Sequence, residues 1–354
     1  MQAERSVWRL ARAGSLDRLG QRTEPLPPPA AGELQIAVRA VGLNFADVLA
    51  CLGLYAAAPR GRFVPGLEIA GEVIALGAPG PDAPPTYRVG DRVVALTRFG
   101  GYATHVNARP AWVWALPADW SYEQGAAFPV QALTAWYGLV QQGAARAGSV
   151  VLVQSAAGGV GLQALTLLAR LGARPVGVVG SHAKRAFLRE HFALPGAQCV
   201  VRGDGELGAE LDAALAALGA PGFDLVFDAV LGEGFRAAYR RLAPEGRYLL
   251  YGAADFMRPG PGRAWPHLAW RWLRRPRLDP LAMIGENRSL MAFNLIWLWE
   301  QSARLAAALA ALGALGLGRP WIGARHPFGQ AREALAELQS GGTVGKSILY
   351  VDAP

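Results

Sequence analysis

Two patterns of apolar and polar residues divide the chain. Up to about residue 116, short segments alternate between apolar and polar positions, and Gly and Pro separate them. Alternation of this kind is typical of strands with one buried face. It is clearest over residues 33–41, 69–76 and 91–96. We therefore expect the first third of the chain to be rich in β-structure.

A different pattern follows. Residues 121–142 carry apolar side chains at helical spacing, with an interruption at Pro129. Beyond them, short apolar runs alternate with helical segments, and these runs are residues 150–154, 175–179, 198–201, 224–228, 247–251 and 290–295. Strands joined by helical crossovers build a parallel, doubly wound sheet. The sequence therefore predicts an α/β fold that contains such a sheet.

The C-terminal tail, from about residue 302, holds an Ala- and Leu-rich helix, a helix over 329–339 and a strand over 346–351. These elements do not continue the strand–helix alternation of the parallel sheet, so we expect the tail to return to the N-terminal part of the chain. With 354 residues, two domains are expected. We predict that one comprises residues 1–122 completed by 302–354, and the other residues 123–301.

The segment around residue 155 predicts a nucleotide site. An apolar run over 150–154 leads into a turn of small residues, and leucines at helical spacing follow. A pyrophosphate needs this order, because small residues let the backbone approach it and a helix N-terminus offers free N–H groups. Read as G-x-G-x-x-G, the turn has Ala156, Gly158 and Gly161, so its first position is degenerate.

The next predicted strand indicates which nucleotide binds. Ser181 lies about 20 residues beyond Gly161, where enzymes that prefer NAD place an acid against the ribose hydroxyl. Here Ser181, Lys184 and Arg185 supply a hydroxyl and cationic donors instead. Such donors suit a 2′-phosphate, so the sequence favours NADPH.

Composition sets broad limits. Hydrophobic residues make up 52% of the chain and charged residues 18%, which is typical of a well-buried globular protein. The net charge of +8 is carried mostly by arginine, and we interpret it as a feature of overall composition rather than as a nucleic-acid footprint. Two distant cysteines fit neither a metal site nor a disulfide framework. Without a signal-peptide pattern or an apolar run of about 18 residues, a soluble, cytoplasmic protein is expected.

Several segments carry a family resemblance. They are residues 41–48 (VGLNFADV), 64–73 (VPGLEIAGEV), 89–93 (VGDRV), 100–103 (GGYA), 155–161 and 344–346 (VGK). In this order the chain resembles the medium-chain dehydrogenase/reductase superfamily, in its zinc-free quinone oxidoreductase group. Residues 287–295 are similar to the branch related to the vesicle amine transport protein. The resemblance implies a GroES-like β-barrel catalytic domain, a Rossmann domain, NADPH in the cleft and a homodimer joined through the Rossmann sheet.

The zinc-dependent relatives differ at two positions. They need a Cys at the place of Asn44 and a His beside Glu68, where this chain has Leu67. A zinc site requires three or four converging ligands, which two isolated cysteines cannot supply. The expected reaction is therefore hydride delivery to an acceptor that is already electrophilic, namely a quinone or an α,β-unsaturated carbonyl.

The family assigns roles to individual residues. It places Asn44 and Tyr55 beside the nicotinamide, so the resemblance implies that both position the substrate and stabilise its developing negative charge. Tyr137 is a further candidate, and Glu68 is interpreted equally as a structural or a proton-relay acid. The implied cofactor contacts run from the phosphates to the nicotinamide, and they are Asn44, Thr134, Gly158, Gly159, Val160, Ser181, Lys184, Arg202, Gly252, Phe293, Leu295 and Lys346.

Residues 263–275 contain three tryptophans and four arginines. The first interpretation is a helix that covers the sheet edge, and the second is a cleft wall for a bulky acceptor. A membrane surface or a stacking platform for nucleic acid comes third.

Three functions remain open from the sequence. The first is an NADPH-dependent quinone or enone reductase. The second is an enoyl-thioester reductase of polyketide or fatty-acid type. The third is an NADPH-binding protein that acts in vesicle, membrane or RNA association with little catalysis.

Overall fold

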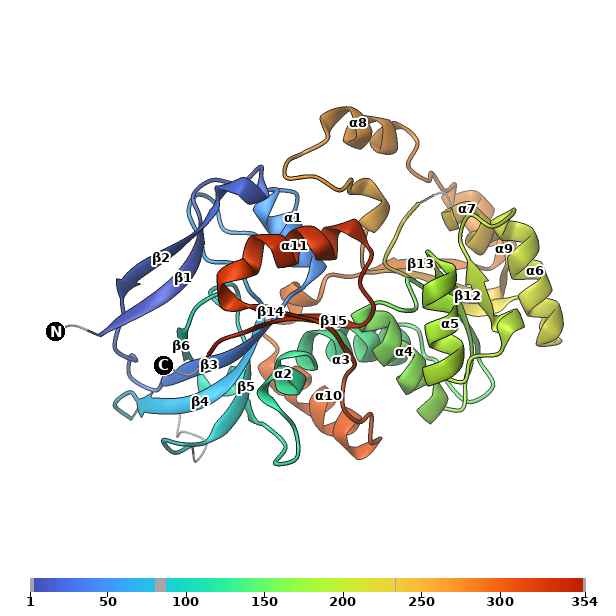
Figure 1. Ribbon diagram of the computed structural model, residues 1–354. Helices are drawn as coiled ribbons and strands as arrows, with labels where there is room; N and C mark the ends of the chain where they lie inside the picture. Colours follow the sequence, from blue (N-terminus) through green and yellow to red (C-terminus); the bar gives the residue numbers. More distant parts are fainter. Residues whose placement is uncertain (1–2, 80–86, 233, 353–354) are drawn as a thin grey trace.

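The computed structural model describes residues 3–79, 87–232 and 234–352. Figure 1 shows the N-terminal third on one side and the middle of the chain on the other, with the red C-terminal strands lying against the N-terminal side. Each side is built around its own sheet.

The first sheet is mainly antiparallel, and among the described residues its strands run in the order β14-β15-β3-β4-β5-β7, with β6 paired to β3. Its strands are β3 (Leu34–Gly42), β4 (Glu68–Leu76), β5 (Arg92–Leu96), β6 (His105–Ala108), β7 (Val113–Ala115), β14 (Ile322–Pro327) and β15 (Lys346–Tyr350). A separate antiparallel hairpin joins β1 (Glu4–Leu10) to β2 (Leu19–Pro25). We call this side the barrel lobe.

Short helices close the barrel lobe. They are η1 (Leu16–Arg18), α1 (Phe45–Cys51), η2 (Pro110–Trp112), α2 (Tyr122–Ala126), η7 (Phe328–Gln330) and α11 (Ala331–Ser340). A continuous core fills the space between strands and helices and includes Val7, Ile36, Val48, Ile69 and Leu335.

The second sheet is parallel, in the order β10-β9-β8-β11-β12-β13 within the described part of the chain. Its strands are β8 (Val150–Gln154), β9 (Arg174–Val179), β10 (Cys199–Val201), β11 (Phe223–Asp228), β12 (Leu242–Leu250) and β13 (Ser289–Ala292). The order reverses between β8 and β11. Ligands bind at such a point, outside the carboxyl ends of the strands. We call this side the Rossmann lobe.

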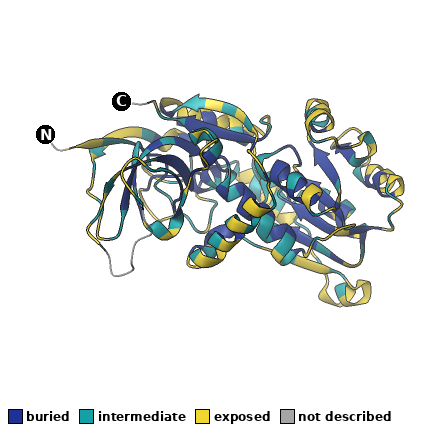
Figure 2. Cartoon of the chain, turned by 90° about the horizontal axis from the view of Figure 1, so that it is seen from below, coloured by how far each residue is buried: buried dark blue, intermediate teal, exposed yellow. Residues whose placement is uncertain are grey.

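Helices cover both faces of the parallel sheet, and Figure 2 shows the buried strands in dark blue between helices with exposed outer faces. The helical segments of this part of the chain, whether or not they lie on the sheet, are α3 (Pro129–Trp136), the π-helical turn η3 (Tyr137–Gln142), α4 (Gly159–Arg170), α5 (His182–His191), η4 (Gly196–Gln198), α6 (Leu207–Ala217), α7 (Gly234–Arg240), η5 (Ala254–Phe256), α8 (Trp265–Leu273), α9 (Pro280–Glu286), η6 (Leu295–Leu298) and α10 (Ser302–Ala314). Leucines of α4 lie in the core on one face, and α6 and α7 pack on the other.

The predicted fold class, a barrel domain plus a doubly wound parallel sheet, is confirmed. Strand β15 returns from the tail to pair antiparallel with β3. Helix α10 of the same tail instead packs on α3 and contributes Leu312 to the core of the Rossmann lobe. The domain limits at residues 122 and 301 stay a prediction.

The first interpretation of residues 263–275 was wrong. They form α8, but none of its residues is buried, so this helix does not cover the sheet with a buried apolar face. Figure 1 shows α8 standing away from the body of the molecule.

Candidate functional site

The glycine-rich turn lies between β8 and α4. Ser155 adopts a positive φ of 56°, and its carbonyl accepts a hydrogen bond of 2.9 Å from Gly158 N. A Cβ on Gly161 would lie 2.4 Å from the Ser155 carbonyl oxygen, so only glycine fits there. Helix α4 begins at Gly159, and Val160 lies against the core beneath it. The free N–H groups of this helix start therefore face the carboxyl edge of the sheet, as a pyrophosphate site requires.

The tail lies directly against this turn. Gly345 N donates to the Ala157 carbonyl at 2.8 Å, and Gly345 pairs with Gly158 in an isolated parallel bridge. The next residue, Lys346, begins β15. The barrel lobe thus reaches the nucleotide turn through its own C-terminal strand.

Lys346 points into the interior rather than toward the turn. Its Nζ donates to Glu68 Oε1 at 2.5 Å and to Asn44 Oδ1 at 2.9 Å, and the side chains of Lys346 and Glu68 are 2% and 0% exposed. Burial lowers the pKa of Lys346. The hydrogen-bond network orients the Gln131 amide so that its oxygen also accepts from Lys346 and its nitrogen donates to Ala127. We call Asn44, Glu68, Gln131 and Lys346 the buried polar cluster.

Glu68 joins this cluster to the start of α3. Its Oε2 accepts a hydrogen bond of 2.8 Å from Val130 N, in the first turn of the helix. A carboxylate is stabilised there, because the N–H groups of a first helical turn have no partner within the helix. Of the two interpretations made from the sequence, this geometry supports the structural one.

Asp47 supports the cluster from α1. Its carboxylate accepts from Asn44 N at 2.8 Å, from Gly66 N at 3.2 Å and from the Tyr102 hydroxyl at 3.1 Å. Burial raises the pKa of Asp47 to about 6. The first two bonds fix the backbone at the predicted active residue Asn44 and at Gly66, just before β4.

Both N–H groups of the Asn44 side-chain amide already have hydrogen-bond partners. They donate to the Gly42 carbonyl at 3.2 Å and to Glu68 Oε1 at 3.0 Å. In this geometry Asn44 can donate to a substrate oxygen only by releasing one of these partners. Its predicted role as an oxyanion donor is therefore less direct than the family position suggests.

Tyr55 connects the two lobes. Its hydroxyl donates to Asn294 Oδ1 at 2.8 Å, and its ring lies edge-on to Phe99 with the centroids 6.5 Å apart. Burial raises the pKa of Tyr55 to about 12. The phenol is therefore protonated throughout the neutral range and is a hydrogen-bond donor.

The residues expected to border the nicotinamide are only partly brought together. Phe293 lies edge-on to Tyr137 with the ring centroids 4.8 Å apart, and Leu295 is buried in an apolar cluster with Leu67. Gly252 follows β12, and a Cβ there would lie 2.6 Å from the Ala229 carbonyl oxygen. The Thr134 hydroxyl instead donates to the Val130 carbonyl of its own helix at 2.6 Å.

The residues expected to hold the adenosine side lie at the ends of β9 and β10. Ser181 caps α5 by accepting from Lys184 N, and Lys184 Nζ donates to the Gly341 carbonyl at 2.6 Å. Burial and then the charge of Arg202 lower the pKa of Lys184. Arg202 donates to Gln154 Oε1 at 3.2 Å, at the edge of a cavity of about 60 Å³. Cationic groups therefore gather near Ser181, as a phosphate site requires.

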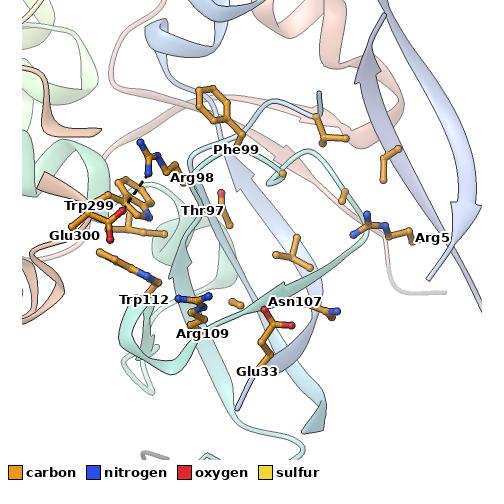
Figure 3. Close-up of a pocket in the computed structure, with 17 residues that line it drawn as sticks. Arg5, Glu33, Thr97, Arg98, Phe99, Asn107, Arg109, Trp112, Trp299 and Glu300 are labelled. Atoms are coloured by element: carbon orange, nitrogen blue, oxygen red, sulfur yellow. Dashed lines mark hydrogen bonds and ion pairs between the residues drawn. The ribbon is translucent and has the colours of Figure 1, made fainter. Parts of the chain in front are cut away.

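A larger cavity lies apart from these residues. It has a volume of about 390 Å³ and lies between the barrel lobe and the segment after η6, and Figure 3 shows Trp112 and Trp299 beside the ion pair of Arg98 and Glu300. None of the predicted site residues lines it.

Sequence reasoning gave no roles to Asp47, Gln131, Gly345 and Asn294. Asp47 stands three residues after Asn44, a spacing typical of a helix N-terminal capping pair, so the sequence did hold a signal for it. Gln131 and Asn294 become informative only when the fold brings α3 and η6 to the barrel lobe.

The described residues contain no group of three or more His, Cys, Asp or Glu side chains that could hold a metal ion. Cys51 and Cys199 are both free and buried. Among the described residues, no helix is long and apolar enough to cross a membrane.

Comparisons with known proteins match both lobes. A family model described as an alcohol dehydrogenase GroES-like domain covers residues 30–118, and one described as a zinc-binding dehydrogenase covers residues 196–349. The chain is 32% identical over 346 residues to the synaptic vesicle membrane protein VAT-1 homolog of Rattus norvegicus, across 96% of this chain and 82% of that protein.

Two further similarities bear on chemistry. The quinone oxidoreductase from Thermus thermophilus, also solved as a complex with NADPH, has a TM-score of 0.77 and 31% identity, with 98% of this chain and 99% of that chain covered. The spectinabilin polyketide synthase system protein NorB of Streptomyces orinoci is 38% identical over 252 residues, which are 70% of this chain and 11% of that protein.

The buried polar cluster generates a prediction about stability. Glu68→Gln and Lys346→Met should each lower the free energy of unfolding by about 3–5 kcal/mol, because each leaves a buried charge without its counter-ion. The double variant should lose clearly less than the sum of the two, since it removes both charges. Denaturant unfolding of the four proteins measures this coupling.

Glu123→Gln is the matched control, because it removes one partner of the exposed Arg325–Glu123 pair and should change stability little. If the loss of unfolding free energy in the double variant equals the sum of the two single losses, the Glu68–Lys346 pair does not couple β4 to β15.

Proposed function

The chain belongs to the medium-chain dehydrogenase/reductase superfamily, in the branch of the VAT-1 homologues, and on this premise we propose that it is an NADPH-dependent, zinc-independent reductase of quinones or α,β-unsaturated carbonyls. The observation that carries the proposal is the glycine-rich turn at the start of α4, with Ser181, Lys184 and Arg202 beyond it. This arrangement combines a pyrophosphate cradle with cationic donors where a ribose-binding acid would stand.

The residues present fit the cofactor. Gly158 and Gly159 leave room for a pyrophosphate against the backbone, and Gly161 packs too tightly for any side chain. Ser181 and Lys184 would offer a hydroxyl and an ammonium group to a 2′-phosphate, and Arg202 would border the adenosine. When bound, NADPH supplies the hydride for reduction.

Tyr55 is the donor at the reacting end. Its phenol stays protonated at neutral pH because burial raises its pKa. Turned from Asn294 toward an acceptor oxygen, the hydroxyl would stabilise the negative charge that grows there during reduction. Asn44 then acts as a positioning residue, because Glu68 and Lys346 hold its amide in place.

Zinc independence rests on the donor set. Asn44 and Leu67 stand where the zinc-dependent relatives need a cysteine and a histidine, and neither residue is a ligand of the kind that zinc prefers. One matching family model is described as a zinc-binding dehydrogenase, but this chain lacks a cysteine and a histidine at those two positions.

A second candidate function is enoyl-thioester reduction. The similarity to NorB, a protein of a polyketide synthase system, favours it. The third candidate, an NADPH-binding vesicle- or RNA-associated protein with little catalysis, takes its support from the names of the VAT-1 homologues.

Two free, buried cysteines support a cytoplasmic location, since cytosolic thiols are kept reduced.

An acceptor panel tests the function. NADPH oxidation should be measured with quinones, enones and crotonyl thioesters, before and after chelation and dialysis. We expect turnover with quinones or enones that survives chelation. Turnover only with the thioester would favour the second candidate, turnover with no acceptor the third, and loss of both zinc and activity on chelation would refute zinc independence.

We also propose a homodimer through the Rossmann sheet. Strand β13 is the edge of that sheet and three of its four residues are exposed, so its backbone can pair with a second copy. The exposed Leu281 and Ile284 of α9 lie close to it in sequence. Light scattering should give twice the mass of the chain, and a monomeric mass would contradict this.

The adenosine-side residues generate a prediction about cofactor choice. Lys184→Ala should weaken NADPH binding about tenfold or more, because a charge-assisted phosphate contact is worth about 1.5–3 kcal/mol. NADH binding should not change, since NADH has no 2′-phosphate. Calorimetry measures both, and Arg189→Ala at the far end of α5 is the control. Equal affinities of the unmodified protein for NADPH and NADH would contradict the assignment of Lys184 to the 2′-phosphate.

Tyr55 generates a prediction about catalysis. Tyr55→Phe should reduce enone turnover about a hundredfold, the usual cost of one oxyanion donor. Quinone turnover should fall less, because quinones accept electrons readily. NADPH affinity should be unaffected. Steady-state rates test this, with Tyr87→Phe in the barrel lobe as control. Unchanged rates with every acceptor would show that Tyr55 is only a structural link to Asn294.

A further inference from the structure

Helix α8 is held away from both sheets by the segment before it. Between η5 and α8, the chain crosses to the barrel lobe, where Leu16 N donates to the Pro261 carbonyl at 2.7 Å and Arg263 donates to the Leu52 carbonyl. Helix α8 follows and stands above the body of the molecule in Figure 1. The helix is therefore fixed at its start but is presented outward.

The amphipathic character of α8 is inverted. Its inner side carries His267, whose ring lies 3.1 Å from the Asp255 carbonyl, and Arg271, which pairs with the Asp255 carboxylate at 2.9 Å. Its outer side carries Trp265, Trp272 and Leu273, which are 61%, 58% and 67% exposed. A helix of a soluble protein normally buries its apolar side. An apolar side that faces outward indicates a contact outside this chain.

The same helix is strongly basic. Arginines occupy positions 263, 271, 274, 275 and 277, and no acidic residue stands between 263 and 277. Arg274 lies 3.8 Å from the ring centroid of Trp270, and Arg275 lies 3.8 Å from that of Trp272. The guanidinium groups are thus stacked on the tryptophan rings. The partner must accept apolar rings and positive charge at the same place.

A cavity behind the helix adds a site for an anionic group. It has a volume of about 410 Å³ and is lined by Arg236, Arg271, Arg274 and Arg275, together with Phe256 and Pro276. Asp255 is the acidic side chain among its lining residues, and it is paired to Arg271. An anionic headgroup at this cavity would have arginines around it and the exposed tryptophans beside it.

We propose that α8 docks the protein onto an anionic phospholipid surface. The rings of Trp265, Trp270 and Trp272 and the side chain of Leu273 enter the boundary between headgroups and acyl chains. The surrounding arginines bind lipid phosphates. Amphipathic helices with tryptophan and arginine bind membrane interfaces in this way. The proposal does not depend on the reductase function, since α8 carries none of the residues assigned to the cofactor or to the acceptor.

Two other occupants fit less well. In a two-fold dimer through α8, the same arginine-rich surface would face its own copy, and the like charges would repel. Nucleic acid offers phosphates and bases but no apolar phase for Leu273. A bilayer with acidic lipids satisfies both the charge and the apolar side.

Vesicle co-sedimentation tests the proposal with the full-length protein. Neutral phosphatidylcholine vesicles are compared with vesicles that also contain phosphatidylglycerol, at low and high salt. We expect binding to the anionic vesicles, a blue shift of tryptophan fluorescence and release by salt. Arg274→Gln/Arg275→Gln should weaken binding roughly thirtyfold, because each arginine near an anionic surface contributes a factor of about five. Trp270→Ser/Trp272→Ser should weaken it about tenfold or more.

Arg146→Gln/Arg170→Gln is the matched control, because it removes the same charge from exposed positions elsewhere and should leave binding unchanged. Three results would overturn the proposal: equal loss in this control, no binding to anionic vesicles, or a halved solution mass in the tryptophan variant. The last would mean that α8 covers a second copy of the chain. NADPH affinity reports whether each variant is folded.

Discussion

The ion pair between Glu68 and Lys346 is the interaction on which the cleft depends. It lies fully inside the molecule and joins strands β4 and β15. Moving two charges out of water costs several kcal/mol, so such a pair is stable only when other hydrogen bonds satisfy its remaining atoms. Asn44, Gln131 and the first turn of α3 provide those bonds. The pair therefore ties together segments almost three hundred residues apart, as the separation of 278 between its partners shows.

The same pair places the reacting end of the cleft relative to the phosphate end. Gly345, next to Lys346, is bonded to Ala157 in the glycine-rich turn, while Glu68 holds Asn44 and Val130. Tyr55 and Asn294 form a second bridge between the lobes. A cofactor bound across the switch point would thus meet a barrel lobe that is fixed by a buried charge pair and by several hydrogen bonds between the lobes. This explains in physical terms why polar residues are buried there at all.

The elements that could be predicted from the sequence are those with a periodic or strongly apolar pattern of residues. The β8–α4 unit could be predicted because a buried strand, a small-residue turn and a leucine-rich helix leave a clear pattern. The hairpin of β1 and β2 could not, because its outward residues are polar and the ion pairs of Arg5 and Arg9 with Glu24 replace an apolar signal. Lys346 was expected among the cofactor contacts from its family position. Only the fold shows that its backbone lies beside the turn while its amine turns inward. Helix α8 was misjudged because its pattern is amphipathic and does not reveal which side faces the protein.

We infer that the Glu68–Lys346 pair transmits the order of the barrel lobe to the nucleotide turn. Hydrogen exchange of the Glu68→Gln variant measures this most directly, because it reads the opening of individual segments. We expect faster exchange at Val130 and over residues 157–161, with α6 and α7 unchanged. If the turn exchanges at the rate of the unmodified protein while only β4 and β15 open, the pair stabilises the barrel lobe alone and the claim is wrong.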